Sequence, residues 1–331
     1  MEKIDPKMVN VESKEMAYRY VAIDNSFLNG VYNSEGFNRL KEVPFISESI
    51  NILRKHSSGI NVVFTTDSPF INIKAKLAGA AYMSHMTAVA TIGFDLYYKH
   101  KNKWCFLSTT KINQASYEVN LIKDLSKKER EYRLYFPLYQ QVQEASLGIR
   151  QEASFKFIKE EKERLIIYGT SISQGGCASR PGLSYGALLG RWLDLDVINL
   201  GFSGSAHMED NITKIINSIP HKYLILELEA NNFFSFQNKL DHFLKQIDSP
   251  QIILISHFPL TRSLIDKDTF KIIKSNYLFQ KKYQNEVILI DGKKALKKYE
   301  YEETVDGIHL NDLGFYGLAK YILKIIRGIK K

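Results

Sequence analysis

Two patterns of apolar and polar residues divide this chain of 331 residues. In the first half, short segments alternate between the two kinds with a period of two, which is typical of half-buried antiparallel strands. We expect strands near residues 61–68, 70–77, 91–98, 103–107, 117–121 and 132–139. Pro137 restricts the last of them to an edge or a bulge, because proline has no backbone N–H to donate. Short alternating strands at this spacing predict an antiparallel β-sandwich, for which we favour a jelly-roll-like arrangement.

The second half alternates continuous apolar runs with amphipathic segments. The apolar runs predict strands near residues 165–169, 196–201, 223–228, 251–256 and 286–290. The amphipathic segments predict helices near residues 184–194, 209–218, 236–247, 267–283 and 312–327, the last with Asn311 as its N-cap. This alternation predicts an α/β fold in which helices cover both faces of a parallel sheet.

A charged stretch at residues 159–164 separates the two patterns. We therefore expect a β-sandwich domain over residues 1–160 and an α/β domain over residues 161–331. Each half is long enough to bury a hydrophobic core of its own.

Three polar residues near strand ends could form a catalytic relay. Ser171 follows the apolar run 165–168, and Asp306 precedes His309 by three residues, ahead of the last predicted helix. A histidine can take the proton of a serine while a carboxylate holds the imidazole in the required tautomer. Ordinary alternatives exist, because Ser171 could cap a helix and the other two could share a structural hydrogen bond. Since ligands bind at the carboxyl ends of parallel strands, we favour the catalytic interpretation.

Two further signals follow the next two predicted strands. Gly204 lies in a glycine-rich turn, whose N–H groups can approach a ligand because no Cβ intervenes, and Asn231 carries a side-chain amide. Acyl transfer needs such donors to stabilise the charge that develops on the carbonyl oxygen. We predict an oxyanion hole made of the Ser171 N–H, the Gly204 N–H and the Asn231 amide. The alternatives are a simple turn for Gly204 and a helix cap for Asn231.

The order of these residues resembles that of the SGNH (GDSL-type) hydrolases, in which Ser, Gly, Asn and His follow one another along the chain. The block around the serine, YGTSISQGGCASRPG at residues 168–182, is similar to that of one subgroup. Members of this subgroup carry a β-rich N-terminal domain with a Gly-x-Asp-Leu-Tyr signature, and this chain has Gly-Phe-Asp-Leu-Tyr at residues 93–97. The resemblance covers both halves. It implies a flavodoxin-like, five-stranded parallel sheet and the residue roles given above.

Two positions depart from the family pattern. Thr170 stands where the Gly-Asp-Ser motif has Asp, a replacement that the subgroup tolerates. The common Gly-Gly-Asn-Asp block is Glu-Ala-Asn-Asn at residues 229–232, which keeps the Asn. Glu229, however, brings a negative charge close to the predicted oxyanion donors.

The residues and the resemblance together imply a serine esterase. We expect it to remove a small acyl group, for which we favour acetyl, from a carbohydrate-like or other polar substrate through an acyl-enzyme on Ser171. Two alternatives stay open. One is an acyltransferase that passes the acyl group to an acceptor hydroxyl, and the other is a catalytically weak glycan-binding protein.

Other residues near the predicted site have two interpretations each. Arg180 could bind substrate or brace its loop against a carboxylate, and His257 is a candidate for substrate contact. We assign Asp95 and Tyr97 to an interdomain hydrogen bond in preference to substrate contact. No histidine adjoins Cys177 in the sequence to activate its thiol, so we expect a buried, unreactive cysteine.

Composition argues against several functional classes. The formal charge is +9, but the lysines are scattered among glutamates without a basic helix, which argues against nucleic acid as a partner. No apolar run approaches the roughly 20 residues that span a bilayer, and no apolar signal core follows Met1. Two cysteines in different predicted domains favour a cytoplasmic location without a disulfide. Since no cluster has metal-ligand spacing, we predict neither a metal nor a cofactor. The sequence does not specify an oligomeric state.

Overall fold

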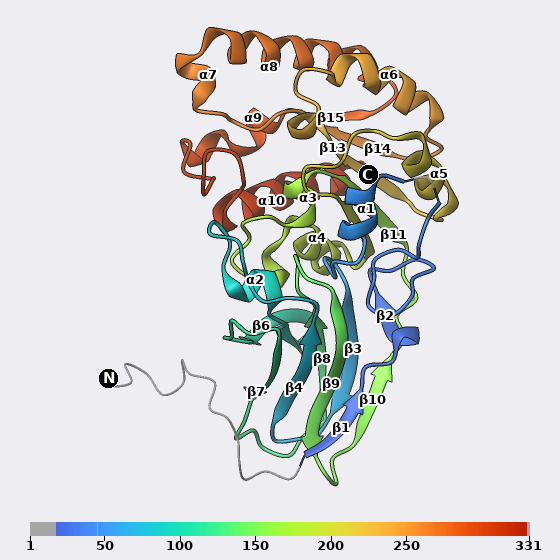
Figure 1. The fold of residues 1–331 in the computed structure, drawn as a ribbon, viewed down its shortest axis with the longest axis vertical. Coiled ribbons are helices and arrows are strands. Elements are labelled where there is room, and N and C mark those ends of the chain that lie inside the picture. The colour runs from blue at the N-terminus through green and yellow to red at the C-terminus, as the bar shows by residue number, and fades with distance from the viewer. Residues whose placement is uncertain (1–17, 45, 330–331) are drawn as a thin grey trace.

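The strands of the first half form two antiparallel sheets that lie in the lower part of Figure 1. The computed structural model describes residues 18–44 and 46–329. One sheet has the order β1-β9-β4-β7, with β1 at Tyr18–Ala22, β4 at Ile71–Leu77, β7 at Ser116–Ile122 and β9 at Val142–Arg150. The other has the order β10-β3-β8-β5-β6, with β3 at Asn61–Thr66, β5 at Asp95–His100, β6 at Lys103–Thr109, β8 at Arg130–Tyr135 and β10 at Phe155–Ile158. The short β2 (Leu28–Asn29) pairs with β3.

The two sheets pack face to face around one apolar core. In β4, for example, Ile73 and Ala75 are buried while Lys74 and Lys76 are exposed, as a period of two requires. The core joins these side chains to residues of the opposite sheet such as Phe64. Along the chain the strands cross repeatedly from one sheet to the other, so the first half is a two-sheet antiparallel sandwich.

The predicted strand at residues 91–98 is wrong in its first part. A short helix, α2 (Ala88–Ile92), occupies this part, and β5 begins only at Asp95. The Thr87 hydroxyl accepts a hydrogen bond from the Ala90 N–H at 3.0 Å and so caps the helix. The helix consists mostly of apolar and β-branched residues, which are also typical of a strand, and the prediction was wrong for this reason. Strands β1, β2, β9 and β10 had no predicted counterpart.

The second half contains the expected parallel sheet of five strands. Its order is β12-β11-β13-β14-β15, with β11 at Arg164–Gly169, β12 at Asp196–Gly201, β13 at Tyr223–Glu227, β14 at Ile252–Ile255 and β15 at Ile288–Ile290. This is the flavodoxin-like order, in which the first strand lies between the second and the third. The predicted domain boundary at residue 160 falls in the short connection between β10 and β11.

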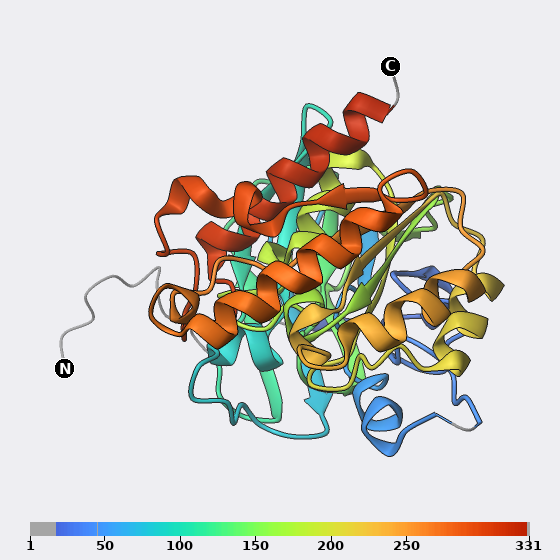
Figure 2. The same ribbon diagram turned by 90° about the horizontal axis from the view of Figure 1, so that it is seen from above.

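Helices cover both faces of this sheet. The larger ones are α4 (Tyr185–Leu193), α5 (Asp210–Ser218), α6 (Phe236–Gln246), α8 (Lys267–Gln280) and α10 (Asp312–Ile329), and the shorter ones are α3 (Ser171–Gln174), α7 (Arg262–Ile265) and α9 (Gly292–Leu296). Figure 2 shows the red α10 and the yellow α5 and α6 on opposite sides of the sheet. The Asn311 side chain accepts from the Gly314 N–H at 3.1 Å, so it caps α10 as predicted. Within residues 18–44 and 46–329, no helix is long and apolar enough to cross a membrane.

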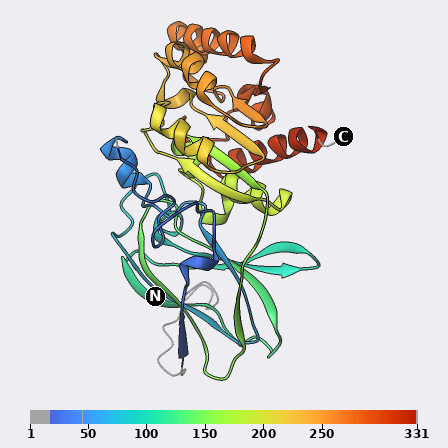
Figure 3. The same cartoon turned by 90° about the vertical axis from the view of Figure 1, so that its right-hand side faces the viewer.

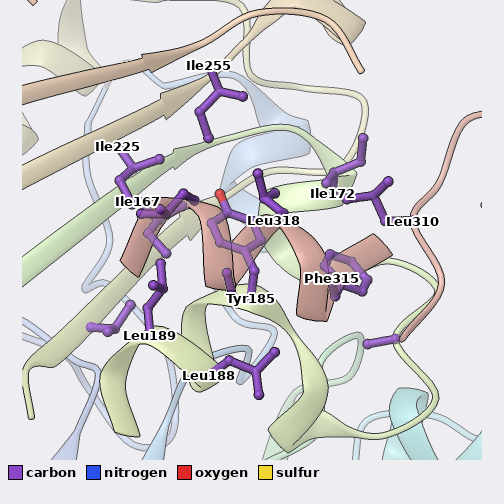
Figure 4. Packing of buried hydrophobic residues seen from close by; sticks show 14 of the residues in the cluster. Ile167, Ile172, Tyr185, Leu188, Leu189, Ile225, Ile255, Leu310, Phe315 and Leu318 are labelled. Carbon is purple, nitrogen blue, oxygen red and sulfur yellow. The ribbon is translucent and has the colours of Figure 1, made fainter. Parts of the chain in front are cut away.

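The apolar packing on the α4 and α10 face follows from the strand period. Ile167 and Ile225 point from neighbouring strands toward Tyr185 of α4 and Phe315 of α10 (Figure 4). The intervening residues of β11, such as Tyr168, belong to the core on the other face. Each strand is therefore buried on both sides, which explains why its sequence is continuously apolar.

The first half also contributes to the core of the second. Helix α1 (Glu48–Leu53) leaves the sandwich and lies beside the α/β half (Figure 3), where Ile50 is fully buried. Arg39, from the same excursion, is fully buried as well. Its guanidinium donates to the carbonyl oxygens of Asn199 at 2.9 Å and Gly201 at 2.7 Å. These carbonyls lie on β12, the edge strand, so the sandwich half closes this edge of the parallel sheet.

Candidate active site

The predicted site residues lie in the loops that follow neighbouring strands. Ser171 comes directly after β11, Gly204 after β12 and Asn231 after β13, and the loop before α10 supplies the pair Asp306 and His309. Strand β11 has β12 on one side and β13 on the other. The chain therefore leaves β11 at the topological switch point, where open α/β sheets bind their ligands.

Ser171, His309 and Asp306 form a continuous chain of hydrogen bonds. The Ser171 Oγ is 2.9 Å from the His309 Nε2, and the His309 Nδ1 is 2.7 Å from the Asp306 Oδ2. The other oxygen of Asp306 accepts from the N–H groups of Ile308 at 3.0 Å and His309 at 2.8 Å. Burial would raise the pKa of Asp306, but hydrogen bonds from the backbone and ring of His309 and from Ile308 lower it below its ordinary value. The carboxylate thus stays ionised and orients the imidazole.

Two backbone N–H groups are available near the serine. Ser171 begins helix α3, so its N–H lies among the first-turn donors that have no partner within a helix. Gly204 has φ of 68°, in the left-handed region that favours glycine, and is exposed. Among the described residues, the Gly204 N–H donates to no protein acceptor. Both donors can therefore turn to a ligand.

The side-chain amide of Asn231 is held by the same turn that carries Gly204. In the orientation that satisfies its neighbours, the amide oxygen accepts from the N–H groups of Ser205 at 2.9 Å and Ala206 at 3.0 Å. Because the oxygen is fixed in this way, the NH2 group lies on the other side of the amide and can serve as a donor. This is the arrangement that a side-chain oxyanion donor requires.

The sequence matches known families over both halves. Residues 162–327, just over half of the chain, match the GDSL-like lipase/acylhydrolase family. The chain belongs to this family. Residues 19–155 match the N-terminal part of SGNH-hydrolase-type esterases. No curated protein matches the sequence.

Solved structures share the fold of this GDSL-like hydrolase. A GDSL-like lipase from Bacteroides ovatus has a TM-score of 0.87 at 27% identity, over 95% of this chain and 98% of the other. The salicylyl-acyltransferase SsfX3 from a tetracycline biosynthetic pathway has a TM-score of 0.68 at 18% identity, over 97% of each chain. A family two carbohydrate esterase from Cellvibrio japonicus has a TM-score of 0.57 at 12% identity, over 95% and 98%. The last two show a common fold.

A buried carboxyl group, which the sequence analysis did not identify, lies behind the serine of this hydrolase. One oxygen of Glu227, at the end of β13, accepts from the Thr170 hydroxyl at 2.7 Å, the Thr170 N–H at 3.2 Å and the Ser173 hydroxyl at 3.1 Å. Burial raises the pKa of Glu227 to about 7, although these donors lower it. The contact accounts for Thr170, because an Asp at this position would face Glu227 with a second carboxylate.

Glu229 does not face the oxyanion donors. Its side chain is buried and accepts from the His257 N–H at 3.0 Å, the Asn276 amide at 3.1 Å and the Gln280 amide at 2.9 Å. The Glu229 carboxylate thus accepts hydrogen bonds from three donors. Glu229 ties the loop after β14 to helix α8.

Arg180 braces the two halves against each other. Its guanidinium is 2.8 Å from the Asp95 carboxylate and 2.7 Å from the Tyr97 hydroxyl, and it lies 3.6 Å from the centre of the Phe106 ring. Asp95, which is fully buried, also accepts from the Gly182 N–H at 2.8 Å. Of the two interpretations for each residue, these contacts favour the loop brace for Arg180 and the interdomain hydrogen bond for Asp95 and Tyr97.

His257 lines two spaces, one of them bounded by Ile172, the residue that follows Ser171. A small cavity of about 20 Å³ lies between Ile172, Ala230, His257 and Ile308. A groove of about 580 Å³ also has Ala230, His257 and Ile308 in its walls, together with Phe233 and Asp306. His257 therefore lies where the two spaces meet.

Cys177 lies much closer to the relay than its sequence context suggests. It is buried, and its thiol is in a group with the side chains of His85, Asp306 and His309. Burial and the nearby Asp306 raise the pKa of Cys177 to about 12. The thiol is thus protonated at neutral pH, which argues against a nucleophile even though two histidines are close.

Gln174 and Tyr139, which no motif marked, hold the segment of Ser171 in place. The Gln174 amide accepts from the Ser203 N–H at 3.0 Å and donates to the Leu138 carbonyl at 3.2 Å. The Tyr139 hydroxyl donates to the Ser171 carbonyl at 3.2 Å. These contacts join α3, the turn after β12 and the first half.

We predict that Glu227→Gln changes the pH dependence of stability. Below about pH 4.5 the Glu227 carboxyl is protonated in both folded and unfolded chains, and between pH 4.5 and about 7 only the unfolded chain loses its proton. Rising pH therefore disfavours the folded wild type through this group, and the effect levels off above pH 7. Relative to Glu227→Gln, the wild type should lose on the order of 2 kcal/mol of unfolding free energy between pH 5 and pH 8 in urea titrations. If the difference in unfolding free energy between wild type and Glu227→Gln were the same at pH 5 and pH 8, the raised pKa of Glu227 would be contradicted.

We predict that Asn231→Ala and Asn232→Ala have different effects. Loss of one oxyanion donor should lower turnover of an acetyl ester by about 10²–10³ in Asn231→Ala. Asn232 is buried and donates to the carbonyls of Ala206 at 2.7 Å and Leu228 at 2.8 Å, so its loss should lower the unfolding free energy by about 1–3 kcal/mol. Turnover per folded molecule and urea unfolding measure the two effects. A larger loss of turnover in Asn232→Ala would overturn this assignment.

Proposed function

We propose that the protein is a serine esterase that removes a small acyl group, with acetyl as the favoured case, from a carbohydrate-like or other polar alcohol. The observation that carries the proposal is the hydrogen-bonded chain from Ser171 through His309 to Asp306 at the switch point of the sheet. Membership of the GDSL-like lipase/acylhydrolase family supports the reaction class.

The proposed reaction follows from this geometry. The His309 Nε2 takes the proton of Ser171 as its Oγ attacks the ester carbonyl. The Ser171 N–H, the Gly204 N–H and the Asn231 amide stabilise the oxyanion, and His309 returns the proton to the leaving alcohol. Water, deprotonated by His309, then attacks the acyl-enzyme and releases the acid. Asp306 holds the imidazole throughout.

The size of the cavity beside Ile172 supports a small acyl group. Its volume is about 20 Å³, and a cavity needs about 10–15 Å³ to hold one water molecule. A methyl group is close to this limit, whereas a longer chain needs the side chains of Ile172 or Ile308 to move. We assign this cavity to the acyl group and the larger groove to the alcohol.

The groove supports an alcohol with both polar and apolar surface. It combines the rings of Phe233 and Phe234 with the charged groups of Arg262, Asp266 and Asp268. A mixture of apolar walls and a few polar groups is typical of small-molecule sites. A carbohydrate ester fits this description.

Both cysteines are free thiols, which supports the cytoplasmic location.

We predict that Ser171→Ala abolishes hydrolysis of an activated acetyl ester and leaves the fold intact. Removal of a triad nucleophile costs several orders of magnitude in turnover, so the residual rate should fall by at least about 10³. Steady-state assays and circular dichroism measure the two effects. Cys177→Ala is the matched control, since its protonated thiol has no role in this mechanism. Near wild-type turnover in Ser171→Ala together with loss in Cys177→Ala would refute the assignment of the nucleophile.

We predict that turnover falls steeply as the acyl chain lengthens. Acetyl esters should be hydrolysed at least about fivefold faster than butyryl esters of the same alcohol, because overpacking a filled site costs about 1–3 kcal/mol. A series of esters with a common leaving group measures this dependence in kcat/KM. Faster hydrolysis of butyryl or longer esters would show that the acyl group lies in the groove.

A further inference from the structure

Two side chains that the esterase mechanism does not use lie against the relay. His85 comes from the loop before α2, and Cys177 follows α3. One ligating atom from each, together with one from Asp306 and one from His309, lie within 4.8 Å of one another. The rings of His85 and His309 have their centres 5.5 Å apart. Two imidazoles, a thiol and a carboxylate thus converge from three separate segments.

Neighbouring contacts hold these segments together. Next to His85, Met86 is buried in the core of the α/β half, and the Thr87 hydroxyl donates to the Ser179 carbonyl at 2.6 Å. The Ser179 N–H in turn donates to the Asp312 carboxylate at 2.8 Å, at the start of α10. The loop of His85, the segment of Cys177 and the loop of His309 are therefore tied to one another. The fold therefore brings His85 and Cys177 to Asp306 and His309, which are already joined by a hydrogen bond.

This set of donors is one that zinc binds. Zinc takes nitrogen, sulfur and oxygen ligands in a tetrahedron, with bonds of about 2.0–2.3 Å. Ligand atoms in such a tetrahedron are roughly 3.3–3.6 Å apart, so small side-chain rotations would close the cluster. Divalent ions that prefer oxygen suit it less, because three of its four donors are nitrogen or sulfur. We propose that His85, Cys177, Asp306 and His309 form a binding site for one zinc ion, whose occupation inhibits the enzyme.

Inhibition follows from the use of His309. Its Nε2 faces Ser171 and its Nδ1 faces Asp306, and a metal bond to either nitrogen occupies the lone pair or displaces the proton on which the relay depends. The ion enters in its hydrated form, the Cys177 thiol releases its proton to solvent, and coordinated waters leave. No change of oxidation state takes place. Removal of the ion by a chelator restores the resting relay.

Binding can be measured without any ester, and so independently of the proposed function. Cobalt(II) replaces zinc in such sites and gives an intense thiolate charge-transfer absorption when cysteine is a ligand. Titration of the full-length protein with cobalt should give this absorption with one ion per chain, and zinc should displace it. Cys177→Ser should lose the band. Cys105→Ser is the matched control, because Cys105 is exposed, and should keep it. Absence of the band in the wild type, or its loss only in Cys105→Ser, would overturn the proposal.

Zinc inhibition supplies the second measurement. His85→Ala and Cys177→Ser should each keep the basal rate on an acetyl ester and raise the zinc concentration for half-inhibition by at least about tenfold. Added chelator should restore the wild-type rate. Since His85 is only half-buried, its variant tests the site even if Cys177→Ser folds poorly. The proposed site would be refuted if wild type and His85→Ala had the same zinc concentration for half-inhibition and cobalt bands of the same strength.

Discussion

The arrangement of the site depends on the hydrogen bonds that the buried guanidinium of Arg39 donates to the parallel sheet. This guanidinium comes from the first half of the chain and binds the Asn199 and Gly201 carbonyls on β12, at an edge of the sheet that would otherwise be open. Burial lowers the pKa of Arg39 to about 9, and the carbonyl oxygens supply acceptors for its buried N–H groups. The same guanidinium lies 5.0 Å from the centre of the Phe202 ring. Since Phe202 begins the turn that carries Gly204, the sandwich half contacts the turn of the proposed oxyanion donor.

Beneath the nucleophile, a second set of buried polar groups continues this arrangement. Glu227 binds Thr170, which in turn caps helix α3 at the serine. On the opposite side, Gln174 and Tyr139 connect α3 to the turn after β12 and to the first half. Ser171 is thus held by contacts to β13, to the turn after β12 and to the sandwich. A fixed nucleophile and fixed donors are what electrostatic stabilisation of a transition state requires.

Local patterns in the sequence predicted much of the fold and named the three residues that the structure joins by hydrogen bonds, Ser171, His309 and Asp306. Strands such as β11 are continuously apolar because both faces are buried, and Ser171, Gly204 and Asn231 could be placed because each follows a strand. The roles of Arg39 and Glu227 depend on contacts between residues far apart in the chain, which neither periodicity nor spacing encodes. Arg39 is one of 45 lysines and arginines, with no local feature to mark it. The same holds for His85, whose approach to Cys177 and His309 depends on how the two halves meet.

In the proposed mechanism the acyl group passes through Ser171. The most direct test is to mix the protein with an activated acetyl ester, stop the reaction in acid during the first turnovers, and locate the label by fragmentation mass spectrometry. We expect one acetyl group, on the Ser171 side chain and absent from the unreacted protein. Acetyl on Cys177 instead, or ester consumption at wild-type rates with no acetylated residue under any quench time, would contradict it.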